Sequence, residues 1–178
     1  MLYRRANVPG GTYFFTVNLL DRRSDLLLRN VEVLREVVSE VKARHPFVIV
    51  AMVVLPEHLH AIWRLPPEDA DYPMRWALIK AGFSRSLRKE EAVSTSRALK
   101  RERAIWQRRY WEHLIRDDDD LARHVDYVHY NPVKHGWVQQ PMDWPYSTLH
   151  RYVRQGVLPQ DWGRSSATMK LQSVSYLR

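Results

Sequence analysis

Two histidines separated by one residue form the leading candidate for a chemical site in this chain. His58 and His60 follow an almost wholly apolar and β-branched run over residues 47–54. Such a run predicts a strand buried on both faces, and Pro56 interrupts it because proline has no backbone donor. Residues 58–64 then predict a second strand. Side chains at i and i+2 point to one face of a strand, so the two imidazoles can share one divalent metal.

A tyrosine and an asparagine further along the chain suggest a second chemical element. Tyr127 and Asn131 lie four residues apart in a stretch that predicts a helix, so they share one helix face. A tyrosine can act as a covalent nucleophile, although a phenol is mostly protonated at neutral pH. A metal that polarises a phosphate makes the phosphorus easier to attack, so a less activated phenol suffices. Asn131 could supply a third metal ligand through its carbonyl oxygen.

Simpler roles compete with these assignments. Tyr127 could be a packed aromatic residue, and Tyr130, three positions further on, is a competing nucleophile on a neighbouring helix face. Asn131 could instead cap a short helical turn that begins at Pro132 and ends at Gly136. The histidines could be ordinary surface or turn residues. Spacing alone leaves these alternatives open.

The elements that must position these residues follow the order β-α-β-β-α-β, with one further helix. This order matches the split βαβ, ferredoxin-like pattern. The predicted fold class is therefore α+β, an antiparallel sheet with an additional C-terminal helix that carries the tyrosine. The chain predicts strands over 12–19, 47–54, 58–64 and 105–115, and helices over 31–44, over 72–89 and after the aspartate run.

The last helix has a predicted start and a predicted end. Four aspartates, residues 117–120, precede it. We expect them to cap the helix rather than to bind a metal, because carboxylates favour the positive end of a helix. The helix should run to Tyr130 and end before Pro132, since a residue that precedes proline avoids the α conformation.

Length and composition narrow the class of protein. The chain has 178 residues, which predicts one domain over 1–150 and a tail over 151–178 that could contact DNA. It has no cysteine, which excludes disulfides, thiolate metal sites and a cysteine nucleophile. No stretch is apolar enough for a membrane span, and the first residues do not resemble a signal peptide. We therefore expect a cytoplasmic protein with no membrane contact.

Charge and aromatic content predict a nucleic-acid partner. The formal net charge is +8, and a basic surface attracts polyanions. Unpaired bases could stack on Trp63, Trp106 or Trp111. The cations expected to bind DNA lie between residues 85 and 109; they are Arg85, Arg88, Lys89, Arg97, Lys100, Arg101, Arg103, Arg108 and Arg109.

Several tracts together resemble the REP-associated tyrosine transposases, which are relatives of the IS200/IS605 transposases among the HUH endonucleases. In that family a histidine pair binds metal, and a Tyr-x-x-x-Asn helix carries the nucleophile and a third ligand. The resemblance assigns these roles to His58 and His60, to Tyr127 and to Asn131. The matching tracts are PGGTYFFTVNL at 9–19, VVLPEHLHAIWRLP at 53–66, IWQRRYWEH at 105–113, DYVHYNPVKHGWV at 126–138 and DWPYS at 143–147.

The resemblance also implies a substrate and a reaction. It implies Mg²⁺ or Mn²⁺ as cofactor and single-stranded DNA beside the hairpin of a repetitive extragenic palindrome (REP) as substrate. Attack by Tyr127 would give a 5′-phosphotyrosine link and a free 3′-OH that can reverse the reaction. We expect a nucleoid-associated monomer, with a homodimer as the alternative.

Two other functions compete with strand transfer. One is a non-catalytic protein on the same fold that binds DNA or RNA hairpins; exposed aromatics on such sheets do bind RNA. An intact set of two histidines and a tyrosine disfavours it. The other is a two-histidine phosphoesterase, which would need two separated His-x-Ser/Thr motifs, and the sequence has none.

Overall fold

A four-stranded antiparallel sheet forms the centre of the molecule. The computed structural model describes residues 7–100 and 102–164. The strand order is β2-β3-β1-β4, which with the chain order of strands and helices is the predicted ferredoxin-like arrangement. The strands are β1 (Thr12–Asn18), β2 (Val48–Val54), β3 (His58–Arg64) and β4 (Trp111–Leu114).

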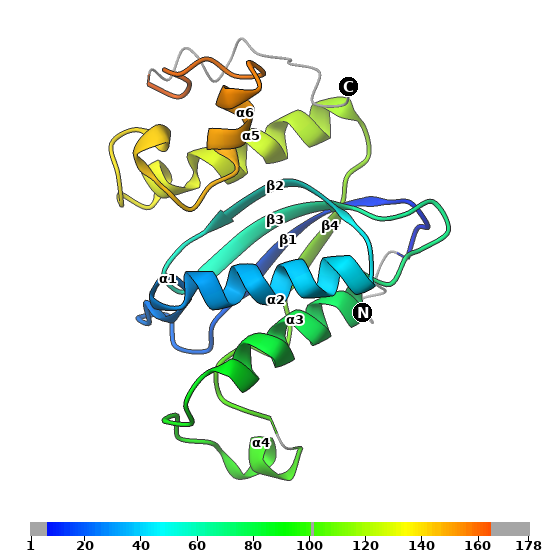
Figure 1. Cartoon of the computed structure of the whole chain (residues 1–178), viewed down its shortest axis with the longest axis vertical. Coiled ribbons are helices and arrows are strands. Elements are labelled where there is room, and N and C mark those ends of the chain that lie inside the picture. Colours follow the sequence, from blue (N-terminus) through cyan, green and yellow to red (C-terminus); the bar gives the residue numbers. More distant parts are fainter. Residues whose placement is uncertain (1–6, 101, 165–178) are drawn as a thin grey trace, which may run out of the picture.

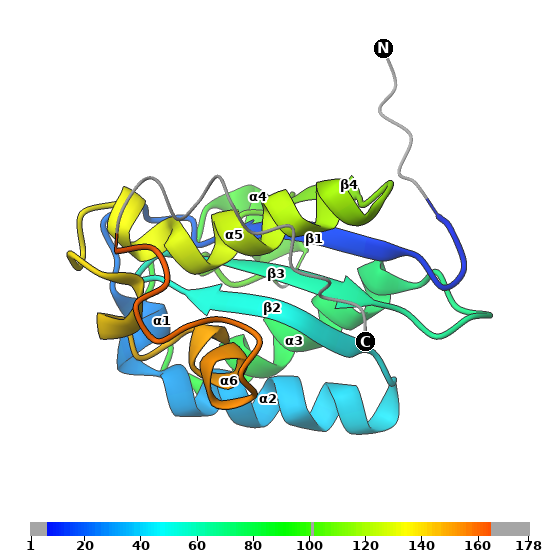
Figure 2. The same cartoon turned by 90° about the horizontal axis from the view of Figure 1, so that it is seen from above.

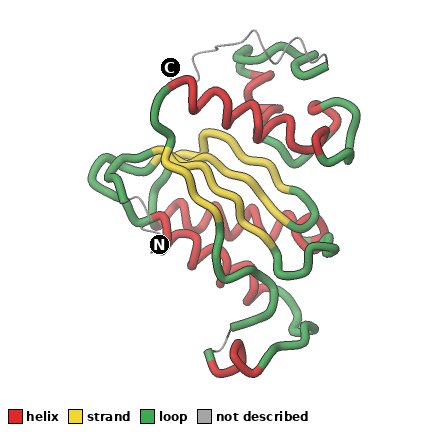
Figure 3. The backbone as a smooth tube through the Cα atoms, turned by 180° about the vertical axis from the view of Figure 1, so that it is seen from behind, coloured by secondary structure: helices red, strands yellow, loops and turns green. Residues whose placement is uncertain are grey.

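Helices cover both faces of this sheet. The helices α2 (Val31–Arg44) and α3 (Tyr72–Ser86) lie on one side and α5 (Asp118–Lys134) lies on the other (Figure 1). Seen from behind, the strands lie between the two helical layers (Figure 3). Among the described residues, no helix has the length and apolar character needed to cross a membrane. The short helices are α1 (Leu26–Arg29), α4 (Thr95–Leu99), η1 (Pro141–Asp143) and α6 (Leu149–Arg154).

The core on the α2 and α3 side comes from alternate residues of the strands. Tyr13, Phe15 and Val17 of β1 are fully buried there, as alternation in a strand requires. Trp63 of β3 stacks on Trp76 of α3 with ring centroids 4.1 Å apart. This apolar packing holds the sheet rigid behind the histidine pair.

A second core fills the α5 side. Phe14 and Ile62 face α5 from the sheet, and Val125 packs against them. The segment after α5 closes this core beside β2, where α6 lies (Figure 2). Leu158 and Trp162 are 2% and 1% exposed within it. The expected boundary between domain and tail, at residue 150, falls inside α6. Of the expected tail over 151–178, the part from residue 165 onward lies outside the described residues.

The predicted strand over 105–115 is wrong for most of its length. Trp106 makes an isolated bridge to Leu19, and the regular strand begins only at Trp111, opposite Thr16. Between these two pairs, β1 spans three residues and the opposite segment spans five. The opposite segment therefore carries two residues more than a regular antiparallel ladder would have. The pattern of apolar residues did not reveal this irregularity because both ends of the segment do contact β1.

The last helix also differs from its predicted end. The helix α5 continues through Pro132 to Lys134, and the helix α3 stops at Ser86 rather than at residue 89. A proline removes one helical hydrogen bond, but the amide of His135 still donates to the carbonyl of Asn131 at 3.0 Å. Asn131 and Pro132 are both buried. Their packing keeps the helix continuous, so Asn131 is not the cap of a new turn.

Candidate functional site

The two histidines stand side by side on β3, as predicted. His60 lies opposite Thr16 of β1 and His58 opposite Asn18. Their ring centroids are 4.9 Å apart, and each residue is 3% exposed. The residues between and after them, Leu59 and Ala61, face the opposite core. The pair therefore lies on the face of the sheet that α5 covers.

Neighbouring side chains fix the orientation of both rings. His58 Nδ1 lies 2.7 Å from Glu57 Oε1, and His60 Nδ1 lies 2.9 Å from Thr16 Oγ1. In each ring these contacts occupy Nδ1 and leave Nε2 as the nitrogen that can bind a metal. Such a bond to the second nitrogen is the usual way that a ligating histidine is oriented.

Burial keeps both histidines neutral at physiological pH. It lowers the pKa of His58, against the opposing effect of Glu57. Burial, together with the charges of His58, His135 and Lys134, lowers the pKa of His60 to about 3. Neutral imidazole is the form that binds a metal. Neither histidine therefore has to release a proton from a charged imidazolium before it binds a metal.

The helix α5 brings Tyr127 to this pair, and Asn131 lies one turn further along the same face of the helix. The rings of Tyr127 and His60 have centroids 5.2 Å apart in an edge arrangement. The Lys134 ammonium lies 4.6 Å from the centre of the Tyr127 ring. In the described part of the chain, Tyr127 and not Tyr130 is the tyrosine with a ring contact to a histidine of the pair.

Unpartnered polar atoms at the site fit a divalent metal. Within the described residues, His60 Nε2 and both polar atoms of the Asn131 side chain are buried without a hydrogen-bond partner. Burying such groups unpaired is costly. An ion would relieve the cost at His60 Nε2 and at the Asn131 amide oxygen, but not at the amide nitrogen, which is a donor. Two imidazole nitrogens and one amide oxygen are acceptable ligands for such an ion.

Three further residues at the site escaped the sequence analysis. Glu57 and Thr16 orient the two imidazoles, and the His135 ring lies 5.2 Å from the His58 ring. The position of Glu57 next to the pair was a usable signal. Thr16 could be found only from the β1–β3 register, and His135 only once α5 was known to continue through Pro132.

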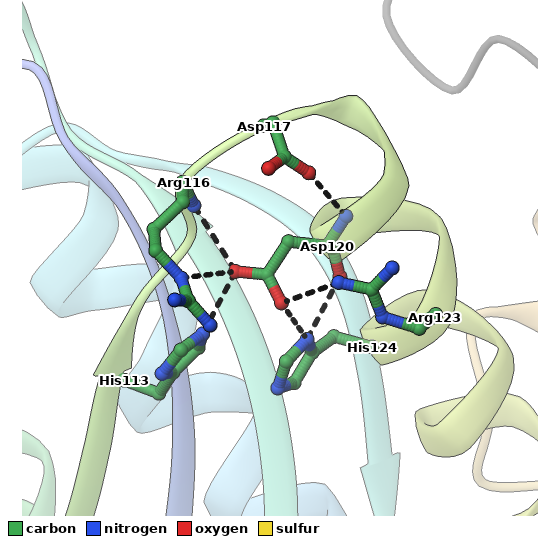
Figure 4. Close-up of polar contacts among 6 residues, drawn as sticks. All are labelled: His113, Arg116, Asp117, Asp120, Arg123 and His124. Carbon is green, nitrogen blue, oxygen red and sulfur yellow. Dashed lines mark hydrogen bonds and ion pairs between the residues drawn. The ribbon is translucent and has the colours of Figure 1, made fainter.

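A second polar cluster holds the start of α5 against β4 (Figure 4). Asp120 is 2% exposed, and its Oδ2 lies 2.8 Å from His113 Nε2 of β4. The same oxygen accepts the backbone amide of Arg116 at 3.1 Å, and Arg123 reaches Oδ1 at 3.4 Å. Burial disfavours the ionised carboxyl, yet these partners hold the pKa of Asp120 at about 2.

Three side chains of this second cluster meet the distance requirement for sharing an ion. The ligand atoms of His113, Asp120 and His124 lie within 4.8 Å of one another. However, His124 Nδ1 lies 2.8 Å from the backbone carbonyl of Asp120, so that nitrogen carries a proton. Arg116 and Arg123 already balance the carboxylate. The cluster therefore serves better as a brace for α5 than as a metal centre.

The predicted cap is confirmed within the same turn. Asp117 Oδ1 accepts the amide of Asp120 at 2.7 Å, which is an N-cap bond. The aspartate run thus has two roles, because Asp117 caps the helix and Asp120 joins it to β4. The sequence pattern predicted the first role only.

The predicted DNA-binding cations divide into exposed and internally bonded groups. A recess beside α3, on the side of the sheet opposite α5, brings together Arg85, Lys89 and Arg108. Arg108 is exposed and also pairs with Glu102 at 2.8 Å. Arg97 also lines the recess but donates to the Arg103 carbonyl, and Arg103 binds Glu91 and the carbonyls of residues 84, 87 and 88. Arg88, Lys100 and Arg109 are exposed, and Arg101 lies outside the described residues.

Two of the three tryptophans expected to stack on bases cannot do so. Trp63 is fully buried and Trp106 is 5% exposed, because both belong to the core beside α3. Trp111, by contrast, is 60% exposed. Composition could count the aromatic residues but could not separate core from surface.

Comparison with known proteins identifies the family. Residues 12–131 match the family described as transposase IS200 like. A REP-associated tyrosine transposase of Escherichia coli K12 is 50% identical over 160 residues, which cover 90% of this chain and 89% of the relative. A protein of Haemophilus influenzae Rd is 47% identical over 162 residues, with 90% and 92% covered.

A solved structure supports the same conclusion. It shows a REP-associated tyrosine transposase bound to a REP hairpin, and it is 48% identical to this chain. The TM-score is 0.79, and the match covers 92% of this chain and 91% of the other. Identity, coverage and fold agree, and the chain therefore belongs to the REP-associated tyrosine transposases of the IS200-like family.

Proposed function

We propose that this transposase cleaves and rejoins single-stranded DNA beside a REP hairpin, with Tyr127 as the nucleophile. One observation carries the assignment of the site. The Tyr127 ring lies 5.2 Å from the ring of His60, a buried neutral histidine whose Nε2 has no partner among the described residues. A nucleophile beside an unpaired imidazole nitrogen is the arrangement that attack on a metal-polarised phosphate requires.

The reaction balances without any external energy source. The Tyr127 hydroxyl oxygen attacks the scissile phosphorus and loses its proton, and the bond from phosphorus to the 3′ oxygen breaks. The 3′ oxygen takes up a proton and leaves as a free 3′-OH. The 5′ end stays on the enzyme as a phosphotyrosine. Attack by a 3′-OH on that link reverses the steps and joins the strands.

The side chains around the tyrosine divide the work of this step. His58, His60 and Asn131 would hold Mg²⁺ or Mn²⁺, which when bound polarises the phosphate. Glu57 and Thr16 keep the two imidazoles in their ligating orientation. The Lys134 ammonium beside the Tyr127 ring stabilises the negative charge that develops at the phenol and the phosphate.

The substrate follows from the family and from charge. The solved relative is bound to a REP hairpin, and this chain carries a net charge of +8. We therefore assign hairpin DNA with a single-stranded flank to this chain, with the exposed cations beside α3 contacting the backbone. We infer from this substrate that the protein acts in the cytoplasm, at the nucleoid. The site assembles from residues of one chain, which favours a monomer.

A covalent adduct provides the decisive test. Hairpin DNA with labelled single-stranded flanks is incubated with Mn²⁺, and the protein is examined on a denaturing gel and by mass spectrometry. We expect an adduct on Tyr127 that Tyr127→Phe abolishes while hairpin binding persists. Tyr130→Phe is the matched control and should retain the adduct. Adduct loss in Tyr130→Phe alone would overturn the assignment, and binding without any adduct would favour the non-catalytic alternative.

A further inference from the structure

A strip of the sheet beside the histidine pair is not covered by α5. On the α5 face, Thr16 and Asn18 of β1 are only partly buried, and Trp111 of β4 is 60% exposed. An exposed tryptophan on a sheet face is unusual, since this side chain is normally mostly buried. The strip borders the proposed metal site, so a DNA strand bound at that site would also contact the strip.

The strand register places Trp111 in one row with the metal pair. Thr16 of β1 is opposite His60 on one side and opposite Trp111 on the other. Directly opposed residues project from the same face of a sheet. His113, two residues after Trp111, contacts Asp120 of α5, which confirms that this is the α5 face. Two strand spacings, roughly 10 Å, therefore separate the backbone at Trp111 from that at His60.

Positive charge leads from this row around the β4 edge. Arg108 and Arg109 are exposed and lie just before β4; Arg109 has no ion pair among the described residues, and Arg108 also pairs with Glu102 at 2.8 Å. Arg108 also lines the basic recess beside α3, on the opposite side of the sheet. β4 pairs with β1 alone among the described strands, so its outer edge carries no further strand. A DNA backbone held in the recess can thus pass over this edge and arrive at Trp111 before it reaches His60.

We propose that Trp111 is a stacking site for an unpaired nucleobase of the cleaved strand, adjacent to the scissile phosphate. The inference rests on the proposed function and adds a contact that the metal and the tyrosine do not supply. A base on the indole fixes the sugar and phosphate that follow it, so the phosphate is presented to Tyr127 in one orientation. Stacking accepts any base, because every base has a π-face.

The chemistry of the strip favours a nucleobase over a protein partner. One isolated indole with polar neighbours, Thr16 and Asn18, offers far less apolar area than a stable protein interface needs. Its charged neighbours in the chain, Arg108 and Arg109, suit a phosphodiester backbone. The same combination of an aromatic face and adjacent cations is typical of single-strand binding surfaces.

The test uses hairpin DNA with 2-aminopurine placed in turn at each unpaired nucleotide beside the cut. Binding is followed without divalent metal, so that the DNA stays intact. We expect one position to be strongly quenched on binding wild-type protein, and Trp111→Ala to remove that quenching and weaken binding roughly 5- to 100-fold. Trp111→Phe should restore most of both. Trp137→Ala, an exposed tryptophan outside the sheet, is the matched control.

Each result has a defined meaning. Quenching that survives Trp111→Ala, or an equal loss in Trp137→Ala, would overturn the inference. The Mn²⁺ adduct on Tyr127, measured on the same DNA, separates this inference from the proposed function. If the adduct forms in the wild-type protein but no 2-aminopurine position shows quenching that depends on Trp111, the stacking site alone is wrong. If no adduct forms, the function itself is wrong.

Discussion

In the described part of the chain, two histidine clusters lie on one sheet face, and they use the same residue type in opposite ways. Phe14 lies between them, with its ring 5.5 Å from His60 and 4.9 Å from His124. In the first cluster a buried imidazole nitrogen has no partner within the described residues. In the second, Asp120 and the backbone engage the histidine nitrogens that face them.

The difference teaches how a ligand set is recognised. In both clusters the side chains are close enough to share an ion. Among the described residues, only the first cluster has buried ligand atoms without a hydrogen-bond partner. The second surrounds its carboxylate with two arginines, and a cation would have to displace them. Between these two clusters, the availability of lone pairs, more than the number of histidines, distinguishes the candidate ligand set from the structural contact.

The largest expected effect follows from removing a ligand of the first cluster. His60→Ala and His58→Ala should each abolish Mn²⁺-dependent cleavage and lower Mn²⁺ affinity, because each removes one imidazole from the pair. Calorimetric titration with Mn²⁺ measures the affinity directly. His124→Ala is the matched change in the second cluster and should leave Mn²⁺ affinity unchanged. Loss of Mn²⁺ binding in His124→Ala, with retention in His58→Ala, would reverse the comparison.

The second cluster should matter for stability. Asp120→Ala leaves His113 and two arginines without their shared carboxylate, and breaking such a buried group costs roughly 3 kcal/mol. Urea unfolding measures the change in free energy. Asp119→Ala, in the same helical turn but exposed, is the control and should cost well under 1 kcal/mol. Equal costs in both variants would show that the brace is only a generic effect of helix-terminal charge.

Acid should affect the two clusters in different pH windows. The pKa of His60 falls from 6.5 in the unfolded chain to about 3 in the folded protein, so its contribution to stability is full above pH 6.5 and is lost as the pH falls toward 3. Buried His129 behaves in the same way. The pKa of Asp120 falls from 3.8 to about 2, so its contribution is lost only below about pH 4.

Unfolding free energies measured from pH 7.5 to 4.5 test these windows. We expect the wild-type protein to lose stability over this range, and His129→Gln to lose less. The cost of Asp120→Ala should stay nearly constant, since its carboxyl is ionised throughout. A cost that disappears as the pH falls from 7 to 5 would mean that the Asp120 carboxyl takes up a proton in this range, contrary to its lowered pKa.

The smallest expected effect concerns the salt dependence of DNA binding. Each phosphate neutralised on a single strand contributes about −0.7 to the slope of log K against log[salt]. Arg85→Gln should make the slope less negative by about this amount, because Arg85 is exposed in the basic recess. Arg116→Gln should change it little, since Arg116 is paired with Asp120. The reverse result would place the DNA on the second cluster.

Local pattern predicted the parts of the site that depend on one element. The alternation in residues 58–64 placed both histidines on one face, and the four-residue spacing placed Tyr127 and Asn131 on one helix. The end of α5 was not predictable, because tertiary burial of Pro132 overrides its local preference. Asp120 and Thr16 act across elements, so their roles depend on strand register, which one sequence does not contain. Arg103 illustrates the same limit, since its carbonyl partners belong to distant residues.

The continuity of α5 has a mechanical consequence. Tyr127, Asn131 and His135 follow one another at steps of four residues, so about 6 Å of axial rise separates each from the next. The helix is fastened at one end by Asp120, and the reactive residues lie along the rest of it. Because the helix is continuous between them, Tyr127 and Asn131 keep a fixed separation along its axis. The nucleophile and the amide ligand are therefore held by one rigid element, and a change that displaced the helix would displace both groups together.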